Sequence, residues 1–192
     1  MTTTNTRSRR GPRPAWVRYP ALCLIWIVGV PITTLRGRRW PRMLSRAMTR
    51  MLAKWPAYRP AAHDVLVCAY FKSGTNWTMQ LAVQIAHRGR AEFDHIHDLV
   101  PWPEVPARAG WAVPVTDDSG WLASPTSLRA IKTHLPLGVV PYEAAARYIC
   151  VVRDPKDVFV SSYHFTRSAA MGPMMPTVAE WLDVYLSPDT PI

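Results

Sequence analysis

The stretch Val65-Leu66-Val67-Cys68-Ala69-Tyr70-Phe71-Lys72-Ser73-Gly74-Thr75-Asn76-Trp77 decides the fold, because it has the parts needed to hold a phosphate-like anion. Its first half is a short, unbroken apolar run, which predicts a buried strand of a parallel sheet. Gly74 allows a tight turn in which successive backbone N–H groups point at an anion, and Lys72 adds a positive charge. The helix predicted to follow directs its partially positive N-terminus to the same place.

This helix is predicted to end at Gly89 and to pack through one apolar stripe formed by Trp77, Leu81, Ala82, Ile85 and Ala86. The loop before it differs from the Walker A sequence, in which the lysine follows the second glycine, because Lys72 precedes the only glycine of the loop. The loop alone leaves two interpretations open. It is either an anion-binding loop or an ordinary strand-to-helix turn with a solvated lysine.

Charge divides the chain into two parts. The 192 residues suffice for one domain with a substantial core, and an apolar content of 48% argues against disorder over most of the chain. Residues 1–60 contain 13 Lys and Arg and no acidic residue, whereas residues 61–192 contain 10 basic and 13 acidic residues. The net charge of +10 therefore belongs to an N-terminal extension, 1–60, and not to the predicted folded domain, 61–192. We expect no nucleic-acid partner, because the basic region has no recognisable nucleic-acid-binding module.

The basic extension contains an apolar stretch, residues 19–35. Its apolar part is about seventeen residues long, the lower limit for a membrane-spanning helix, and Pro31 would kink it. Arginines flank it on both sides, so the positive-inside rule gives no orientation. Residues 40–55 have the pattern of an amphipathic helix that lies on anionic lipid. We expect residues 7–59 to contact a membrane surface, the alternative being an arm that packs on the same chain or on a partner.

The three cysteines do not form a disulfide framework. Cys68 and Cys150 lie in apolar runs predicted to be strands, where a small buried thiol is the ordinary interpretation. This usage is consistent with a reducing, cytoplasmic compartment. The Pro- and Trp-rich residues 100–106 are interpreted as an irregular loop.

A second strand is predicted over residues 129–134 and ends before Pro136. Side chains alternate along a strand, so Lys132 and His134 are expected on the same face near its carboxyl end. Open sheets of parallel strands bind ligands at this end of the strands. A structural or merely exposed histidine is the alternative.

A third apolar run, residues 148–152, predicts another strand. The helix after it is expected to begin at Asp154-Pro155, because Asp is a good N-cap and Pro fits the first helical position. Arg153 then lies at a carboxyl end of the sheet, with Ser161 two turns into the helix. The pair could bind a second phosphate. A surface ion pair between Arg153 and Asp157 is the alternative.

Three fragments in this order resemble the soluble-type sulfotransferase family, whose members use 3′-phosphoadenosine 5′-phosphosulfate (PAPS). They are Tyr70-Phe71-Lys72-Ser73-Gly74-Thr75-Asn76-Trp77, Ile131-Lys132-Thr133-His134-Leu135-Pro136 and Val152-Arg153-Asp154-Pro155-Lys156-Asp157-Val158, the last continued in register by Ser161-Ser162-Tyr163-His164-Phe165. The resemblance implies an α/β fold of three layers, P-loop NTPase-like, with a mainly parallel sheet and helices on both faces. The family's glycine-rich C-terminal segment has no match after Phe165, so we expect the fold to be incomplete at its C-terminus.

The resemblance also implies site residues. The 5′-phosphosulfate would be held by Lys72 and the backbone of Ser73, Gly74, Thr75, Asn76 and Trp77. Arg153 and Ser161 would bind the 3′-phosphate. His134 would be the general base, with Lys132 close to the transferring group. Phe71 stands where the family usually has proline, and Asn76 stands where many members have threonine.

The sequence therefore predicts a PAPS-dependent sulfotransferase, or the N-terminal part of one, acting on a hydroxyl or amine. No metal is expected, because a sulfuryl group carries less negative charge than a phosphoryl group and fixed cations could suffice. The acceptor, whether a small molecule, a lipid or a glycan, and the oligomeric state stay open. Trp102, Trp111 and Trp121 are either walls of an acceptor pocket or packing residues.

Two other functions compete with this prediction. The first is a catalytically inactive, truncated nucleotide-binding or membrane-associated fragment. The second is a P-loop kinase or NTPase, which is disfavoured by the place of Lys72 in its loop and by the motifs around His134 and Arg153.

Overall fold

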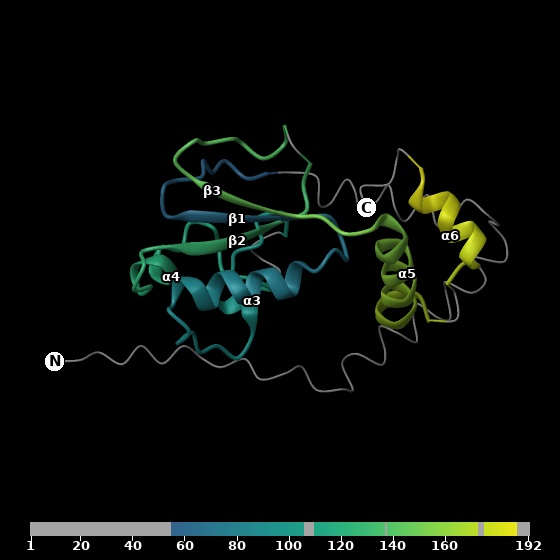
Figure 1. Cartoon of the computed structure of the whole chain (residues 1–192), viewed down its shortest axis with the longest axis horizontal. Coiled ribbons are helices and arrows are strands. Elements are labelled where there is room, and N and C mark those ends of the chain that lie inside the picture. The colour runs from purple at the N-terminus through teal and green to yellow at the C-terminus, as the bar shows by residue number, and fades with distance from the viewer. Residues whose placement is uncertain (1–54, 106–109, 137, 173–174, 188–192) are drawn as a thin grey trace.

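The computed structural model describes residues 55–105, 110–136, 138–172 and 175–187, and its centre is a three-stranded parallel sheet (Figure 1). The strands are β1 (Asp64–Ala69), β2 (Arg129–Thr133) and β3 (Arg147–Val151), in the spatial order β2-β1-β3. Both pairings are parallel. The three carboxyl ends therefore meet at one edge of the sheet, as the strand predictions required.

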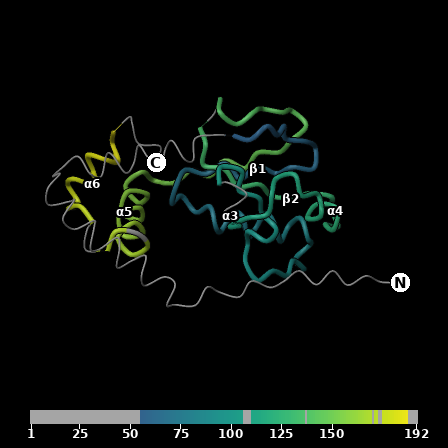
Figure 2. Tube along the Cα trace, turned by 180° about the vertical axis from the view of Figure 1, so that it is seen from behind, coloured from purple at the N-terminus to yellow at the C-terminus, as the bar shows by residue number. Residues whose placement is uncertain are grey.

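The helical elements are α3 (Thr75–Ala86), η2 (Ile96–Asp98), α4 (Ser119–Leu122), α5 (Pro155–Thr166), η4 (Arg167–Met171) and α6 (Val178–Tyr185). Helix α3 packs against β1 and β2, whereas α5 contacts η4 and α6. Figures 1 and 2 show α5 and α6 beyond the carboxyl ends of the strands. The predicted α/β class and parallel sheet are confirmed. In the described ranges α3 is the main helical cover of the sheet, and the second helical layer stays a prediction.

The core lies between α3 and the strands, and its buried side chains are Val67, Met79, Ala82, Val83, Val100 and Ala130. The predicted stripe of α3 is wrong for its larger members, because Trp77, Leu81 and Ile85 are 78%, 61% and 71% exposed. Residues 79, 82, 83 and 86 form a second apolar stripe of helical period. The small side chains of Ala82 and Ala86 let this stripe lie close to the sheet.

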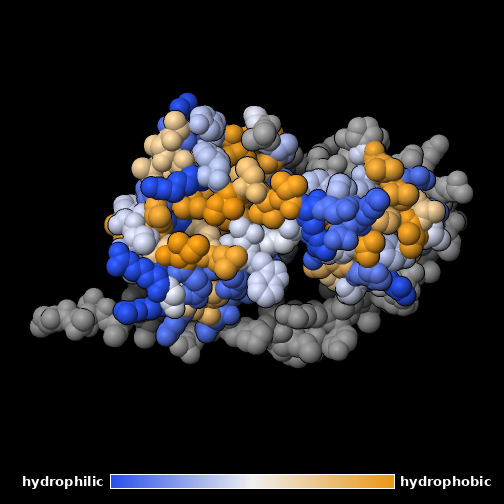
Figure 3. All heavy atoms as spheres, viewed as in Figure 1, coloured by the Kyte–Doolittle hydropathy of each residue, from blue (hydrophilic) through white to orange (hydrophobic). Residues whose placement is uncertain are grey.

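Strand β3 is less buried than its apolar sequence predicted. Ile149 and Cys150 are exposed, and Val152 just beyond the strand is 92% exposed. The prediction of a buried Cys150 is therefore wrong, and Cys68 is half-buried. The edge position alone is not the reason, because β2 also lies at an edge of this sheet and is buried throughout. Helix α3 packs against β2 and β1, whereas β3 pairs only with β1 among the described residues. Figure 3 shows apolar surface over the strands and again over the α5–α6 part.

A buried ion pair joins the amino ends of β1 and β2. Arg129 Nε donates to Asp64 Oδ1 at 2.8 Å, and both side chains are almost fully buried. The second carboxylate oxygen of Asp64 accepts from the Ala61 N–H at 2.8 Å and from the Tyr58 hydroxyl. This network fixes the register of the two strands at the end opposite to the predicted site.

Most of the predicted N-terminal extension, with the apolar stretch 19–35, lies outside the described residues. Residues 40–54 of the predicted amphipathic helix also lie outside them. No helix within the described ranges has the length and apolar character needed to cross a bilayer.

Candidate functional site

The loop between β1 and α3 turns through two residues with left-handed backbone, Lys72 at φ 64° and Gly74 at φ 107°. The Ser73 N–H donates to the Tyr70 carbonyl at 3.1 Å. No side chain caps the N-terminus of α3. The Thr75 hydroxyl is buried and has no hydrogen-bond partner among the described residues. The loop thus presents uncapped helix amides and an unsatisfied hydroxyl, a combination that favours an anion.

Lys72 and Arg153 lie together at the carboxyl ends of β1 and β3. Arg153 Nη1 donates to the Lys72 carbonyl at 3.0 Å. Lys72 Nζ lies 3.9 Å from the centroid of the Phe165 ring on α5, and its pKa is lowered by burial and by the Arg153 charge. Arg153 Nη2 is 3.6 Å from an Asp157 oxygen, so the predicted surface ion pair is present as well.

Helix α5 begins as predicted, with the Asp154 side chain accepting from the Lys156 N–H at 2.8 Å and with Pro155 in its first turn. Ser161 is half-buried on this helix. Within the described ranges no hydrogen bond joins Ser161 to Arg153, so the predicted pair stays a prediction. The neighbouring Ser162 is fully buried.

His134 lies directly after β2, and its ring is fixed by a backbone carbonyl. Nδ1 is 2.7 Å from the carbonyl oxygen of Ala69 at the end of β1. A carbonyl only accepts, so Nδ1 carries the proton of the neutral ring and Nε2 is a hydrogen-bond acceptor. Burial lowers the pKa of His134; the Ala69 bond opposes this effect and the Lys132 charge adds to it. His134 is therefore neutral near pH 7, with Nε2 able to take a proton.

Lys132 is 6% exposed, and its ammonium nitrogen lies 3.4 Å from the centroid of the Trp102 ring. Burial lowers the pKa of Lys132 to about 8. The same Trp102 ring meets the His134 ring edge-on, with 5.8 Å between the centroids. Lys132 and His134 thus share one neighbour, as expected for two side chains on the same face of a strand.

Aromatic rings connect His134 to the loop and to α5. Phe71 meets His134 edge-on with 6.0 Å between centroids, and it meets Phe165 at 5.7 Å. Phe165 also lies beneath the Lys72 ammonium group. The departure from the family's usual proline therefore places a ring between the strand-end histidine and α5.

Glu104 is a residue of this site that the sequence interpretation missed. Its carboxylate is buried, and Oε1 accepts from the Thr133 hydroxyl at 2.5 Å and from the His134 N–H at 2.7 Å. Oε2 accepts from Trp102 Nε1 at 3.0 Å. The available signal was a lone acid inside the apolar, proline-rich residues 100–106. Of the other two candidate tryptophans, Trp111 is exposed and Trp121 stacks on a histidine away from this site.

Comparison with known proteins assigns the family. The family model described as "Sulfotransferase domain" matches residues 62–191. The chain belongs to the sulfotransferase family. The predicted family resemblance is thereby confirmed.

Named sulfotransferases are similar to this chain over 65% to 85% of its length. Sulfotransferase 1C2 of Oryctolagus cuniculus is 30% identical over 133 residues, which are 65% of this chain and 42% of that protein. Sulfotransferase 1B1 of Mus musculus is 33% identical over 132 residues, with 65% and 42% covered. Sulfotransferase 1 family member D1 of Rattus norvegicus is 29% identical over 171 residues, with 85% and 52% covered. The chain spans about half the length of the curated relatives it matches.

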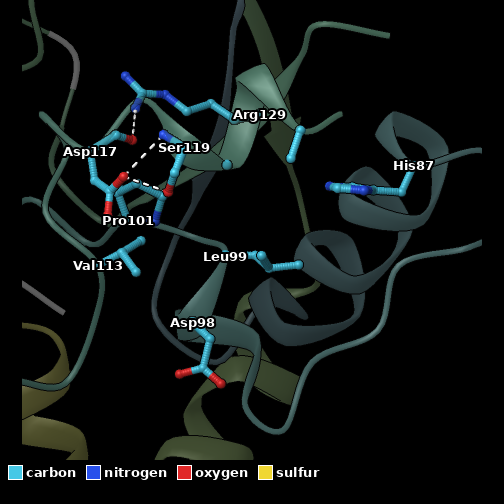
Figure 4. A pocket seen from close by; sticks show the side chains of 10 residues that line it. His87, Asp98, Leu99, Pro101, Val113, Asp117, Ser119 and Arg129 are labelled. Atoms are coloured by element: carbon cyan, nitrogen blue, oxygen red, sulfur yellow. Dashed lines mark hydrogen bonds between the residues drawn. The ribbon is translucent and has the colours of Figure 1, made fainter. Parts of the chain in front are cut away.

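This sulfotransferase domain has a cavity at the amino end of β2, with a volume of about 280 Å³ (Figure 4). Figure 4 shows the Arg129 side chain reaching the main chain of Asp117, where Arg129 Nη1 donates to the Asp117 carbonyl at 2.9 Å, and the Asp117 carboxylate directed toward Ser119. Arg129 also pairs with Asp64, so its charge is already compensated inside the fold. The anion-binding features gather at the opposite end of the strands. Across the described ranges, His, Cys, Asp and Glu form no group of three or more that could hold a metal.

Proposed function

We propose that this sulfotransferase domain binds PAPS and takes part in the transfer of its sulfuryl group to a hydroxyl or amine acceptor. PAPS supplies an activated sulfuryl group on a phosphate leaving group. The observation that carries the proposal is the meeting of an anion-binding loop and a neutral, oriented histidine at one edge of a parallel sheet. Ligands bind at this edge in open α/β sheets.

In this proposal the loop after β1 holds the 5′-phosphosulfate through Lys72 and through the backbone of Ser73, Gly74, Thr75, Asn76 and Trp77. The residues fit such a group. A side chain at Gly74 would meet no atom within 4 Å, so the space in front of the loop is open. The buried Thr75 hydroxyl also lacks a partner that an anion oxygen could supply. Lys72 then stabilises the negative charge that develops on the leaving phosphate oxygen.

Arg153 and Ser161 are proposed to bind the 3′-phosphate. The Arg153 side chain is 39% exposed, and its Asp157 partner is 65% exposed. A solvent-exposed ion pair of this kind contributes at most about 1 kcal/mol. Exchange of the Asp157 carboxylate for a phosphate therefore costs little, and a guanidinium group suits phosphate recognition.

His134 is proposed as the general base. The acceptor's hydroxyl or amine proton passes to Nε2 while the acceptor atom forms its bond to sulfur and the bond from sulfur to the leaving phosphate oxygen breaks. The Ala69 carbonyl keeps Nδ1 protonated and thereby stabilises the imidazolium that results. Lys132, 3.4 Å above the Trp102 ring, is proposed to lie close to the transferring group.

The test combines donor binding with sulfuryl transfer on the 192-residue chain. Calorimetry measures binding of adenosine 3′,5′-bisphosphate, and label from radioactive PAPS is followed into phenols, alcohols, sugars and amines. His134→Ala is expected to abolish transfer and retain binding, whereas the exposed His164→Ala retains both. Lys72→Met is expected to weaken binding, with the exposed Lys156→Met as its control.

Each outcome separates the competing functions. Binding without transfer by the unchanged chain would favour the inactive nucleotide-binding fragment. Magnesium-dependent turnover of ATP would favour the kinase or NTPase. Failure to bind the bisphosphate would overturn the donor site.

We also propose that the chain is cytoplasmic and contacts a membrane surface through residues 7–59. The supporting observation is the presence of 13 basic and no acidic residues in 1–60. A lipid acceptor would suit this location, although a small-molecule or glycan acceptor fits the same chemistry. Replacement of Arg36, Arg38, Arg39 and Arg42 by serine is expected to reduce co-sedimentation with anionic liposomes. Equal sedimentation of both proteins, or binding to neutral liposomes alone, would contradict the proposal.

A further inference from the structure

Glu104 is a buried carboxylate with no part in the reaction proposed above. Glu104 is 4% exposed. The segment that contains it lies beside β2, where the Lys132 N–H donates to the Pro101 carbonyl at 3.0 Å. Burying a carboxylate costs free energy unless it is well paired. Three hydrogen bonds to Glu104 offset this cost. Their donors are the Thr133 hydroxyl, the His134 N–H and the Trp102 indole N–H. His134 is the proposed general base, and the Trp102 ring contacts Lys132.

The first contact acts on His134. Glu104 Oε1 accepts from the His134 N–H at 2.7 Å and from the Thr133 hydroxyl at 2.5 Å. Strand β2 ends at Thr133, so the His134 backbone lies beyond the pairing with β1. Without other hydrogen bonds this backbone could change its direction. The Glu104 bonds fix the main chain, while the Ala69 carbonyl fixes the ring. Together they define where His134 Nε2 lies.

The second contact acts on Lys132 through an aromatic ring. Glu104 Oε2 accepts from Trp102 Nε1 at 3.0 Å, and the Lys132 ammonium lies 3.4 Å from the centroid of the same ring. His97 stacks on this ring as well, with 5.5 Å between centroids and 17° between planes. A carboxylate that accepts from an indole N–H makes the ring more electron-rich and strengthens its attraction for a cation.

We propose that Glu104 is a positioning residue that fixes the His134 main chain and, through Trp102, holds the Lys132 ammonium at the proposed site. The proposal rests on the proposed function, because it assigns Glu104 a task through two residues of that site. Glu104 touches neither the donor nor the acceptor in this scheme.

The charges around Lys132 determine the sign of the test. Lys132 interacts with the Glu104 carboxylate, which raises its pKa, and with the Lys72 ammonium, which lowers it. Two histidines, His97 and His134, also lie within electrostatic range. Removal of the Glu104 charge therefore leaves Lys132 with its burial and the Lys72 charge, both of which disfavour the protonated form. Its midpoint of titration should fall.

The experiment measures the titration midpoint of Lys132 in the absence of sulfuryl donor and acceptor. The chain has four lysines, Lys54, Lys72, Lys132 and Lys156, so ¹³C-lysine labelling gives few signals, and Lys132→Met assigns the relevant one. In Glu104→Gln we expect the Lys132 midpoint to fall by about one pH unit. The Trp102 indole N–H signal, assigned by its loss in Trp102→Phe, should also move. The exposed Glu92→Gln is the control and should change neither signal.

The outcomes also separate this proposal from the proposed function. An unchanged Lys132 midpoint in a folded Glu104→Gln chain would overturn the positioning role, whatever the transfer assay gives. If circular dichroism shows that Glu104→Gln does not fold, Trp102→Phe is tested in its place, because it removes the indole N–H that donates to Glu104. A Lys132 titration midpoint that does not fall in Trp102→Phe overturns the proposal. Where the unchanged chain transfers sulfuryl groups, Glu104→Gln should lower kcat about 10- to 100-fold, leave the donor KM nearly constant and move the alkaline limb of the rate profile to lower pH.

Discussion

Replacing Lys132 by methionine is expected to stabilise the fold, because Lys132 is a cation held in a buried position. Burial lowers its pKa from 10.5 to about 8. Each unit corresponds to about 1.4 kcal/mol, so the buried ammonium lowers the free energy of unfolding by about 3 kcal/mol below pH 8. Methionine keeps most of the volume and loses the cation–π contact with Trp102, a loss of about 1 kcal/mol. We expect Lys132→Met to be more stable by about 2 kcal/mol at pH 7.

The pH dependence gives the sharper test. Between pH 8 and 10.5 the unfolded chain holds the Lys132 proton and the folded chain does not, so the stability of the unchanged protein rises with pH. Lys132→Met lacks this rise. The difference between the two proteins should therefore shrink by about 2–3 kcal/mol from pH 7 to pH 10.5. Tyr58 and Tyr70, whose pKa values burial raises to about 12, are common to both proteins and cancel.

Urea unfolding followed by circular dichroism measures both free energies at a series of pH values. The exposed Lys156→Met serves as the control and should change the stability by less than about 0.5 kcal/mol at each pH. The reasoning is refuted if Lys132→Met destabilises the chain at pH 7, or if its difference from the unchanged protein stays constant up to pH 10.5. Either result would mean that burial of the Lys132 ammonium does not lower the free energy of unfolding.

Three further changes probe the rest of the structure. Arg129→Met leaves the Asp64 carboxylate buried without its cation and should cost about 3–5 kcal/mol in urea unfolding. Thr75→Val removes a buried hydroxyl without a partner, so it should stabilise the ligand-free chain by about 1 kcal/mol and weaken bisphosphate binding, both measured by thermal melting with and without ligand. Cys150 should react with a maleimide at least about tenfold faster than Cys68, because burial raises the pKa of the Cys68 thiol to about 11, as followed by mass spectrometry.

Each of these changes has a matched control. The exposed Arg90→Met should alter stability by less than about 0.5 kcal/mol, and a loss below about 1 kcal/mol in Arg129→Met would speak against the buried pair. Thr75→Ser keeps the hydroxyl, so equal bisphosphate binding by the serine and valine variants would exclude a role for it. The thiol measurement uses Cys23→Ser, and equal rates at the two remaining cysteines would contradict the burial argument.

Features set by neighbouring residues could be predicted from the sequence. Asp154-Pro155 begins α5 because an N-cap and a helical φ are local properties. Lys132 and His134 share the Trp102 ring because alternation along a strand is fixed by the backbone. The order of strand, loop and helix around Gly74 follows in the same way.

Features set by distant residues could not be predicted. Two apolar stripes run along α3, and only contact with the sheet decides that Met79 is buried and Leu81 exposed. Glu104 binds groups that lie 29 and 30 residues later in the chain, so no local pattern marks it as part of the site. The exposure of Cys150 likewise depends on which strands α3 covers, β1 and β2, and not on the apolar sequence of β3.

Among the described residues β3 pairs with β1 alone, and this has a consequence for the behaviour of the purified protein. An edge strand offers backbone groups for pairing, and here it also carries exposed apolar side chains such as Ile149 and, just beyond it, Val152. Such an edge is a template on which a strand of another molecule can add. Protein concentration, as well as temperature, will therefore determine how long a sample stays monodisperse, and light scattering should rise first in the most concentrated samples.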